Sequence, residues 1–211
     1  MQHFNQQIIA GWERFYRANL IQSITGFKPA SLIGTTSPDG IPNLAIFSSI
    51  VHLGSNPALI GYINRPISAA PHTLANIQAT KVYTINHIQA AFVAQAHQTS
   101  AKYDAAVNEF TATGLTMQWI EGIEEPFVAE SNIQYALQLV EIIPITHNHT
   151  FLVIGEITDI FLKDILPEAD GLIAIDKAGS LACLGSDTYC CGNITQRFHF
   201  AKPDRPVTSI L

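Results

Sequence analysis

The sequence predicts a mainly β fold, an antiparallel barrel with helices attached, in one domain that spans residues 1–211. Three observations predict this class. Segments with the pattern of strands outnumber those with the pattern of helices, and several strand segments follow one another directly, as hairpins do. The chain has 211 residues, of which 47% are hydrophobic. A chain of this size can bury a core without disulfides or metal ions.

The N-terminal part predicts a helix followed by a hairpin. In "FNQQIIAGWERFYRANL" apolar residues recur three and four positions apart, which predicts an N-terminal helix over about residues 4–18. Two apolar runs then flank the turn sequence Ser37-Pro38-Asp39-Gly40. Asp-Gly between such runs is a strong hairpin signal, and the proline fixes the first turn dihedral.

The middle of the chain alternates between strand and helix patterns. We expect strands at 57–63 and 81–88, and a short helix from His72 to Thr80 between them. The segment at about 90–111 is rich in Ala and Gln and predicts a helical insertion, for which a break near Thr99-Ser100 is one alternative.

The last third predicts two long strands and then irregular structure. Residues 135–145 and 150–162 are rich in branched apolar residues and are joined across "THNH". From Asp164 onward, a short strand is expected at "GLIAI" (171–175), among loops marked by Gly and Pro.

The charge balance and the cysteines argue against several classes of protein. A net charge of −6 disfavours nucleic-acid binding, which needs clustered Lys and Arg. No apolar run reaches the about 18 residues of a membrane helix, and the first residues lack the pattern of a signal peptide. Three cysteines, with Cys190 and Cys191 adjacent, make no disulfide framework, so we expect a cytoplasmic protein. His147 and His149 lack a third ligand with recognisable spacing, and we expect no metal site.

One long stretch of the chain has no acidic residue and few basic ones. From Gly40 through Tyr103 there is no Asp or Glu, although the chain carries 17. Arg65 is the only Lys or Arg between Lys28 and Lys81. Its guanidinium can bind phosphate oxygens with two hydrogen bonds, and the lack of carboxylates keeps repulsion of an anion low. This composition favours an anion site near Arg65.

The helix expected at His72 adds positive potential to that segment. A helix start has unpaired N–H groups and a partial positive charge, which suit an anion. The side chains of His72, Thr73 and Asn76 can share one edge of the first turn and donate hydrogen bonds. Ser48 and Ser49, at the end of an apolar strand, can form a second wall. A plainer interpretation stays open, in which Thr73 only caps the helix, the arginine is a surface residue and the serines only satisfy the strand end.

The order of these parts resembles a known family. "ASLIGTTSPDG" is followed by "NLAIFSSIVHLGSNPALIGYINRP", "PHTLANIQATKVYTINHI" and "NEFTATGLT", and later by "TFLVIGEI" and "LACLGSDTYC". This pattern, from about Ala30 to Tyr189, resembles the flavin reductase-like family of FMN-binding split β-barrels. The strand-end serines, the Arg before a Pro and the His-Thr-x-x-Asn at the helix start are its most specific parts.

The resemblance implies a homodimer that binds FMN near the subunit interface. It places the strand segment Asn43 to Phe47 against the isoalloxazine ring, and Ser100 in a turn that touches the flavin. The phosphate and ribityl chain would be held by a further group of side chains. The ten residues implied to bind the cofactor are Asn43, Ile46, Phe47, Ser48, Ser49, Arg65, His72, Thr73, Asn76 and Ser100.

The resemblance implies an oxidoreductase in which FMN accepts hydride from NADH or NADPH, so no side chain is expected to act as a catalytic acid or base. Many relatives carry an Arg-Leu-Gly-Gly-type segment where this chain has "LACLGSDTYC", without the Arg and the second Gly. Two alternatives therefore stay open. One is an FMN-binding electron carrier or flavin-storage protein, and the other is a dimeric structural protein without a flavin.

Overall fold

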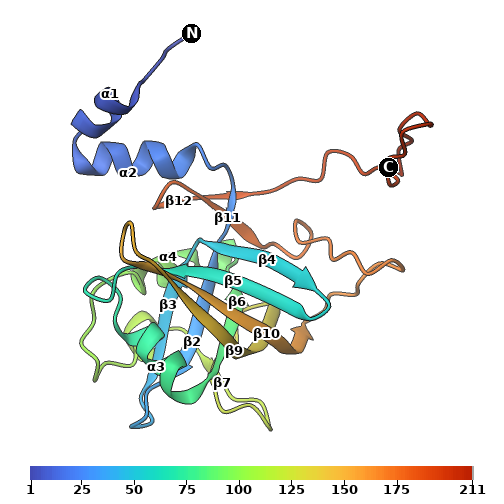
Figure 1. The fold of residues 1–211 in the computed structure, drawn as a ribbon. Coiled ribbons are helices and arrows are strands. Elements are labelled where there is room, and N and C mark those ends of the chain that lie inside the picture. The colour runs from blue at the N-terminus through green and yellow to red at the C-terminus, as the bar shows by residue number, and fades with distance from the viewer. Residues whose placement is uncertain (211) are drawn as a thin grey trace.

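The computed structural model describes residues 1–210 and is built around one seven-stranded antiparallel sheet (Figure 1). Every pair of neighbouring strands in it is antiparallel. In spatial order the strands are β3 (Pro42–Phe47), β2 (Ser31–Thr36), β6 (Val82–His87), β9 (Ile133–Ile145), β10 (Thr150–Leu162), β5 (Ala58–Asn64) and β4 (Ile50–Ser55).

The sheet is curled into a barrel because its two edge strands are consecutive in the chain. β3 ends at Phe47 and β4 begins at Ile50, so only Ser48 and Ser49 separate the opposite edges of the sheet. A flat sheet of seven strands, spaced about 4.8 Å apart, could not be bridged by two residues. This confirms the predicted mainly β barrel with attached helices.

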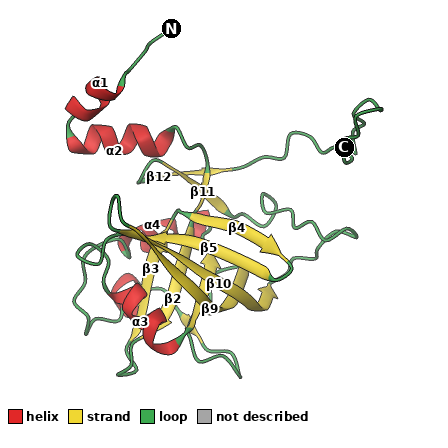
Figure 2. Ribbon diagram, viewed as in Figure 1, coloured by secondary structure: helices red, strands yellow, loops and turns green. Residues whose placement is uncertain are grey.

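Short helices and two small sheets surround this barrel (Figure 2). Near the middle of the chain are α3 (His72–Thr80), the 3-10 helix η1 (Ala90–Phe92), α4 (Val93–Gln98) and α5 (Glu109–Thr113). A three-stranded sheet contains β1 (Lys28–Pro29), β11 (Leu181–Leu184) and β12 (Thr188–Cys191), and a two-stranded one contains β7 (Met117–Gln118) and β8 (Phe127–Val128). No helix within residues 1–210 is long and apolar enough to cross a membrane.

The N-terminal helix expected over residues 4–18 is two helices, α1 (Gln6–Gly11) and α2 (Arg14–Ser23). The break falls at Trp12, whose backbone is extended, and at Glu13, whose carboxylate accepts hydrogen bonds from the first N–H groups of α2. A glutamate is not among the usual N-cap residues, so this start was hard to recognise. The two helices extend from the barrel on one side, and the C-terminal segment extends on the other (Figure 1).

Two other expectations need correction. The helical insertion at 90–111 is helical only in η1, α4 and the start of α5, and residues 99–108 between α4 and α5 are turns and coil. The strand expected at 171–175 is not a strand, and the hairpin of β11 and β12 was not predicted. That hairpin is held by pairing with β1, a partner far away in the sequence.

The strands of the barrel bury side chains on both faces, which gives two hydrophobic clusters. Alternate residues of β2 belong to different clusters, with Ile33 inside the barrel and Leu32 beneath α4 and α5. Tyr62 and Tyr83 fill the barrel interior. The ring of Tyr83 packs so closely on Gly155 that a Cβ there would collide with its hydroxyl group. In the cluster outside the barrel, Leu44 of β3 packs with Phe110 of α5. The edge of β3 that is not paired with β2 faces α5, and the candidate site lies beside this edge.

Candidate functional site

A cavity of about 470 Å³ opens beside β3 and the N-terminal end of α3. It is lined on its barrel side by β3, the residues that follow it and the segment 65–73. Its hairpin side is lined by Gln22, Lys28, Cys183, Ser186 and Tyr189. Nine of the ten expected cofactor residues line the cavity: Asn43, Ile46, Phe47, Ser48, Ser49, Arg65, His72, Thr73 and Ser100.

Buried hydrogen bonds fix the barrel side of the cavity. The Asn43 amide donates from Nδ2 to Thr73 Oγ1 (3.2 Å) and to Thr35 Oγ1 (3.3 Å). Asn76, the tenth expected residue, does not line the cavity, because its amide donates to the same Thr35 hydroxyl at 3.1 Å. Asn43, Thr73 and Asn76 are all buried. The network therefore ties the start of α3 to the hairpin of β2 and β3.

The start of α3 has the chemistry of an anion site. The helix begins at His72, its N-cap position is Pro71, and no side chain caps it. Its first N–H groups are left without intrahelical partners, as at every helix start. The Thr73 hydroxyl is occupied by Asn43, which excludes the plainer interpretation that Thr73 is the cap. Arg65 is exposed and lines the same cavity, and within residues 1–210 its guanidinium makes no hydrogen bond or ion pair.

The two strand-end serines differ in what their hydroxyl groups can do. The Ser49 hydroxyl donates to the Ile63 carbonyl (3.0 Å) and accepts from the Ile63 N–H (3.2 Å), which fastens the end of β3 to β5. Ser48 lies beside Cys183, where the barrel side and the hairpin side meet. Burial raises the pKa of the Cys183 thiol, although Lys28 and Ser48 oppose this rise. Of the two serines, Ser49 is committed to the backbone of Ile63, whereas the Ser48 hydroxyl interacts with the Cys183 thiol at the wall of the cavity.

The apolar residues of β3 give the cavity a smooth strip. Phe47 is buried and packs edge-to-face on Tyr62, with ring centroids 4.9 Å apart. Ile46 is half-buried and also lines the cavity. Such a surface suits a planar aromatic group, while the polar atoms of the site are concentrated at Asn43 and the start of α3.

Glu109 is a cavity residue that the sequence interpretation missed. It is only 5% exposed, and one oxygen of its carboxyl group accepts the N–H of Leu44 at 3.1 Å. Burial raises the pKa of Glu109, while the Leu44 N–H, its own N–H and the nearby His72 oppose the rise. The residue follows Asn108, which caps α5, so the helix start was the available signal. Nothing local, however, connected it with β3.

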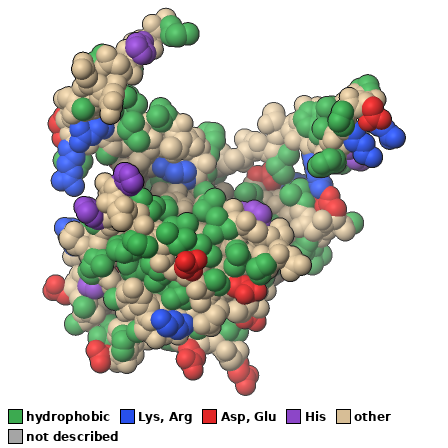
Figure 3. Space-filling view, in the orientation of Figure 1, with side chains coloured by type: hydrophobic (Ala, Val, Ile, Leu, Met, Phe, Trp, Pro, Cys, Tyr) green, Lys and Arg blue, Asp and Glu red, His purple; other side chains and the backbone are tan. Residues whose placement is uncertain are grey.

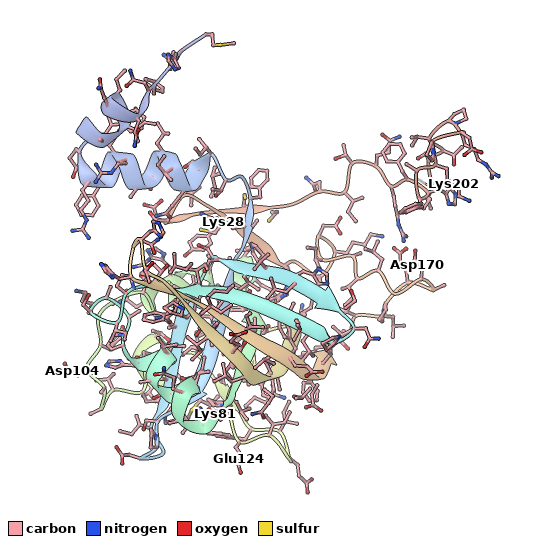
Figure 4. All side chains as sticks on the ribbon, viewed as in Figure 1. Lys28, Lys81, Asp104, Glu124, Asp170 and Lys202 are labelled. Carbon is pink, nitrogen blue, oxygen red and sulfur yellow. The ribbon has the colours of Figure 1, made fainter. Side chains whose placement is uncertain are left out.

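The hairpin side is assembled from distant segments and was also missed. Lys28, labelled in Figure 4 between α2 and the barrel, donates from Nζ to the carbonyls of Gln22 (3.3 Å) and Gly185 (3.2 Å). The hydroxyl of Tyr189 is hydrogen-bonded to Nδ1 of His97, at 2.8 Å, across an exposed contact between β12 and α4. In Figure 3 acidic side chains stand out along the lower edge of the barrel, and others lie on its face and near the C-terminal segment.

Comparison with known proteins agrees with this geometry. A family model described as a flavin reductase like domain matches residues 27–178. The chain is 43% identical to a candidate flavin reductase with a split barrel domain from Shewanella frigidimarina NCIMB 400, with a TM-score of 0.92 over 95% of this chain and 100% of that one. It is 26% identical to flavoredoxin of Desulfovibrio vulgaris (Miyazaki F), with a TM-score of 0.69 over 85% of this chain and 92% of that one.

A third structure shares the fold at lower identity. Nitrilotriacetate monooxygenase component B from Bacillus cereus is 19% identical, with a TM-score of 0.81 over 92% of this chain and 97% of that one. The family model covers most of the chain and includes β2, β3, α3 and α5, the elements that build the barrel side of the cavity. The chain therefore belongs to the flavin reductase-like family.

Proposed function

We propose that the protein binds FMN in this cavity and acts as a flavin reductase-like oxidoreductase with NADH or NADPH as electron donor. The observation that carries the proposal is the junction of three features in one cavity. These are an uncapped helix start at His72, the unpaired guanidinium of Arg65 and the apolar strip of β3. Together they match a ligand with an anionic end and a planar aromatic end.

The residues present fit FMN in the chemistry of their donors. The α3 start, Arg65 and His72 would hold the phosphate, and Asn43 to Phe47 would lie along the ring. Thr73 would line the path between the two ends, and Asn76 would act from behind, by fixing Thr35 and so the hairpin. Bound FMN accepts hydride and passes electrons on, and the protein supplies orientation and electrostatics. No side chain is assigned a catalytic proton transfer.

Two relatives favour different versions of this function. The Shewanella frigidimarina protein, at 43% identity, is a candidate flavin reductase, which supports the nicotinamide-dependent enzyme. Flavoredoxin, at 26% identity, supports the alternative of an electron carrier. The hairpin sequence "LACLGSDTYC" lacks the Arg and second Gly expected of many relatives, and it forms the hairpin side of the cavity. The carrier is therefore the second candidate.

We further propose that the protein is a one-domain homodimer in the cytoplasm. Large apolar side chains are exposed on the N-terminal helices and just after them, including Phe15 (72%), Ile24 (71%) and Phe27 (74%). Val51 of β4 and Val140 of β9 are also exposed on the barrel. Exposed apolar surface of this kind marks interfaces in soluble proteins, and a second copy is the partner that the family resemblance implies.

Anaerobic reduction separates the two candidate functions. The protein, loaded with FMN, is mixed with NADH or NADPH in the absence of oxygen, and the flavin absorbance is followed. Rapid bleaching by either nucleotide is the result expected for the enzyme. Colour that persists until dithionite is added would support the carrier instead. Folded protein that binds no FMN would overturn both and leave the structural alternative.

A further inference from the structure

Glu109 stands out among the residues of the cavity because it is the only carboxylate that lines it within residues 1–210. The other polar side chains on the barrel side include hydroxyl groups (Ser48, Ser49, Thr73), an amide (Asn43), an imidazole (His72) and a guanidinium (Arg65). Glu109 is 5% exposed as a residue, and burial takes water away from its carboxyl group, which costs free energy unless hydrogen-bond donors replace that water. The buried carboxyl group of Glu109 therefore needs hydrogen-bond donors in the folded protein.

One such donor comes from β3, a strand at the edge of the sheet. β3 pairs with β2 on one side only, so the N–H of Leu44 on its other side needs an acceptor, and Glu109 provides it at 3.1 Å. The side chain is aimed at β3 because Asn108 fixes the start of α5, accepting the N–H groups of Phe110 and Thr111. The N–H groups of Leu44 and of Glu109 itself use at most two of the about four lone-pair sites of a carboxylate, so acceptor capacity remains.

Two neighbours of Glu109 indicate what that remaining capacity can serve. The side chain is bonded to β3 at Leu44, within the strip proposed for the ring. It also lies near enough to His72, at the anion end, for the histidine to lower its pKa. A ligand with its phosphate at His72 and its ring along β3 would carry its connecting chain past this carboxyl group. In FMN that chain is ribityl, whose hydroxyl groups are hydrogen-bond donors.

We propose that Glu109 binds the ribityl hydroxyl groups of the flavin and thereby selects ligands that carry a polyol between an aromatic ring and a phosphate. This inference rests on the proposed function, since it assumes a flavin in the cavity. Charged acceptors make stronger hydrogen bonds with hydroxyl groups than neutral ones do. Donors from a bound polyol would also replace the water that Glu109 lost on folding, so the carboxyl group has a role in binding as well as in the sheet.

Three flavins distinguish this role from its alternatives. FMN has both the ribityl chain and the phosphate, riboflavin has the chain only, and lumiflavin has a methyl group in place of the chain. Each is titrated into the natural protein and into Glu109→Gln, which can still accept the Leu44 N–H, and binding is followed by flavin fluorescence. Glu130→Gln is the matched control, because Glu130 also accepts a backbone N–H, from Thr116, but does not line the cavity.

The expected result is that Glu109→Gln weakens FMN and riboflavin by the same factor, about threefold to tenfold for one hydrogen bond, and leaves lumiflavin unchanged. A loss for FMN alone would assign the residue to the phosphate and overturn the inference. An equal loss for all three flavins, or none, would overturn it as well. If the natural protein binds no flavin, the proposed function fails first, which is a different outcome.

A measurement on the natural protein covers the case in which Glu109→Gln does not fold. Riboflavin analogues that each lack one ribityl hydroxyl group are compared with riboflavin. At least one of them is expected to bind more weakly, again by about threefold to tenfold, because the hydroxyl that Glu109 accepts is missing. Equal affinity for every analogue would contradict the inference.

Discussion

The barrel side and the hairpin side of the cavity are held together by different kinds of contact. On the barrel side, Asn43 and Thr73 are buried and joined by hydrogen bonds that also reach Thr35. On the hairpin side, the hydrogen bond between Tyr189 and His97 is exposed. Buried polar networks hold one geometry because breaking any member is costly, whereas exposed pairs exchange with water. Ligand affinity should therefore depend on the barrel side, and the hairpin side should tolerate change.

The largest effect is expected behind the barrel side, at Glu125. This residue is 1% exposed and lies beside Thr36 and Thr80, at the ends of β2 and α3. Burial raises the pKa of Glu125 to about 7 from 4.5. The folded protein thus keeps a proton that the unfolded chain releases, so stability falls as pH rises from about 4.5 to about 7 and stays lower above it.

Glu125→Gln cannot titrate, so it should not show this fall. Relative to the natural protein, its free energy of unfolding should increase by about 3 kcal/mol between pH 4 and pH 8. Urea denaturation at the two pH values measures the difference. If the variant and the natural protein differed by the same free energy of unfolding at both pH values, the pKa of Glu125 would not be raised by folding. The surroundings of Glu125 would then be more hydrated than its burial indicates.

The second effect concerns the anion end of the barrel side. Arg65→Ala should weaken FMN binding by about 1.5–3 kcal/mol, the range for hydrogen bonds to charged groups. Riboflavin, which has no phosphate, should bind equally well to the variant and to the natural protein. Fluorescence titration gives both affinities, with Arg205→Ala, on the C-terminal segment, as the control. Unchanged FMN affinity in a folded Arg65→Ala protein would mean that the phosphate of FMN does not bind at Arg65.

The third effect tests whether the buried network fixes the site. Thr73→Val deletes the hydroxyl that accepts from Asn43, and it should cost about 1 kcal/mol in the free energy of unfolding. FMN affinity should fall with it, because the start of α3 loses its tie to β3. Thr73→Ser keeps the hydroxyl group and should restore both quantities. If Thr73→Val loses stability but keeps its FMN affinity, the network supports the fold and not the site.

The smallest effect is expected on the hairpin side. Tyr189→Phe removes the hydroxyl that meets His97 but keeps the ring. Because the contact is exposed, FMN affinity should change by less than about 0.5 kcal/mol. The same titration measures it. A loss as large as that of Arg65→Ala would show that the two sides contribute equally, and the comparison between them would fail.

The same contrast explains what the sequence could reveal. α3 was predicted from His72 to Thr80 and is found there, and the hairpin around Ser37 to Gly40 was also predicted. Both have local signals, including a turn that Gly40 completes with a positive φ of 81°. The cluster of Arg65, His72 and Thr73 could be recognised because its signals, a lone arginine and a helix start, lie within nine consecutive residues.

The hairpin side has no such local signal. Cys183 enters the cavity because β11 pairs with Lys28 and Pro29. On the barrel side, Glu109 lines the cavity through a similarly distant contact, in which its carboxyl group accepts the Leu44 N–H of β3. These are contacts between segments far apart in the chain, and tertiary packing decides them. Asn76 was expected to contact the cofactor, but its amide instead donates to the Thr35 hydroxyl of β2 and so does not line the cavity. Local chemistry was therefore predictable, and the assembly of distant segments was not.

The central claim is that this cavity binds FMN, and the visible absorption spectrum during a titration with FMN tests it most directly. The protein is purified without added cofactor, its spectrum is recorded, and FMN is then added in steps while flavin fluorescence is followed. We expect a flavin spectrum at the start or saturable quenching during the titration, with one FMN per chain at saturation. A folded protein that is colourless and leaves the fluorescence of added FMN unchanged would contradict the account.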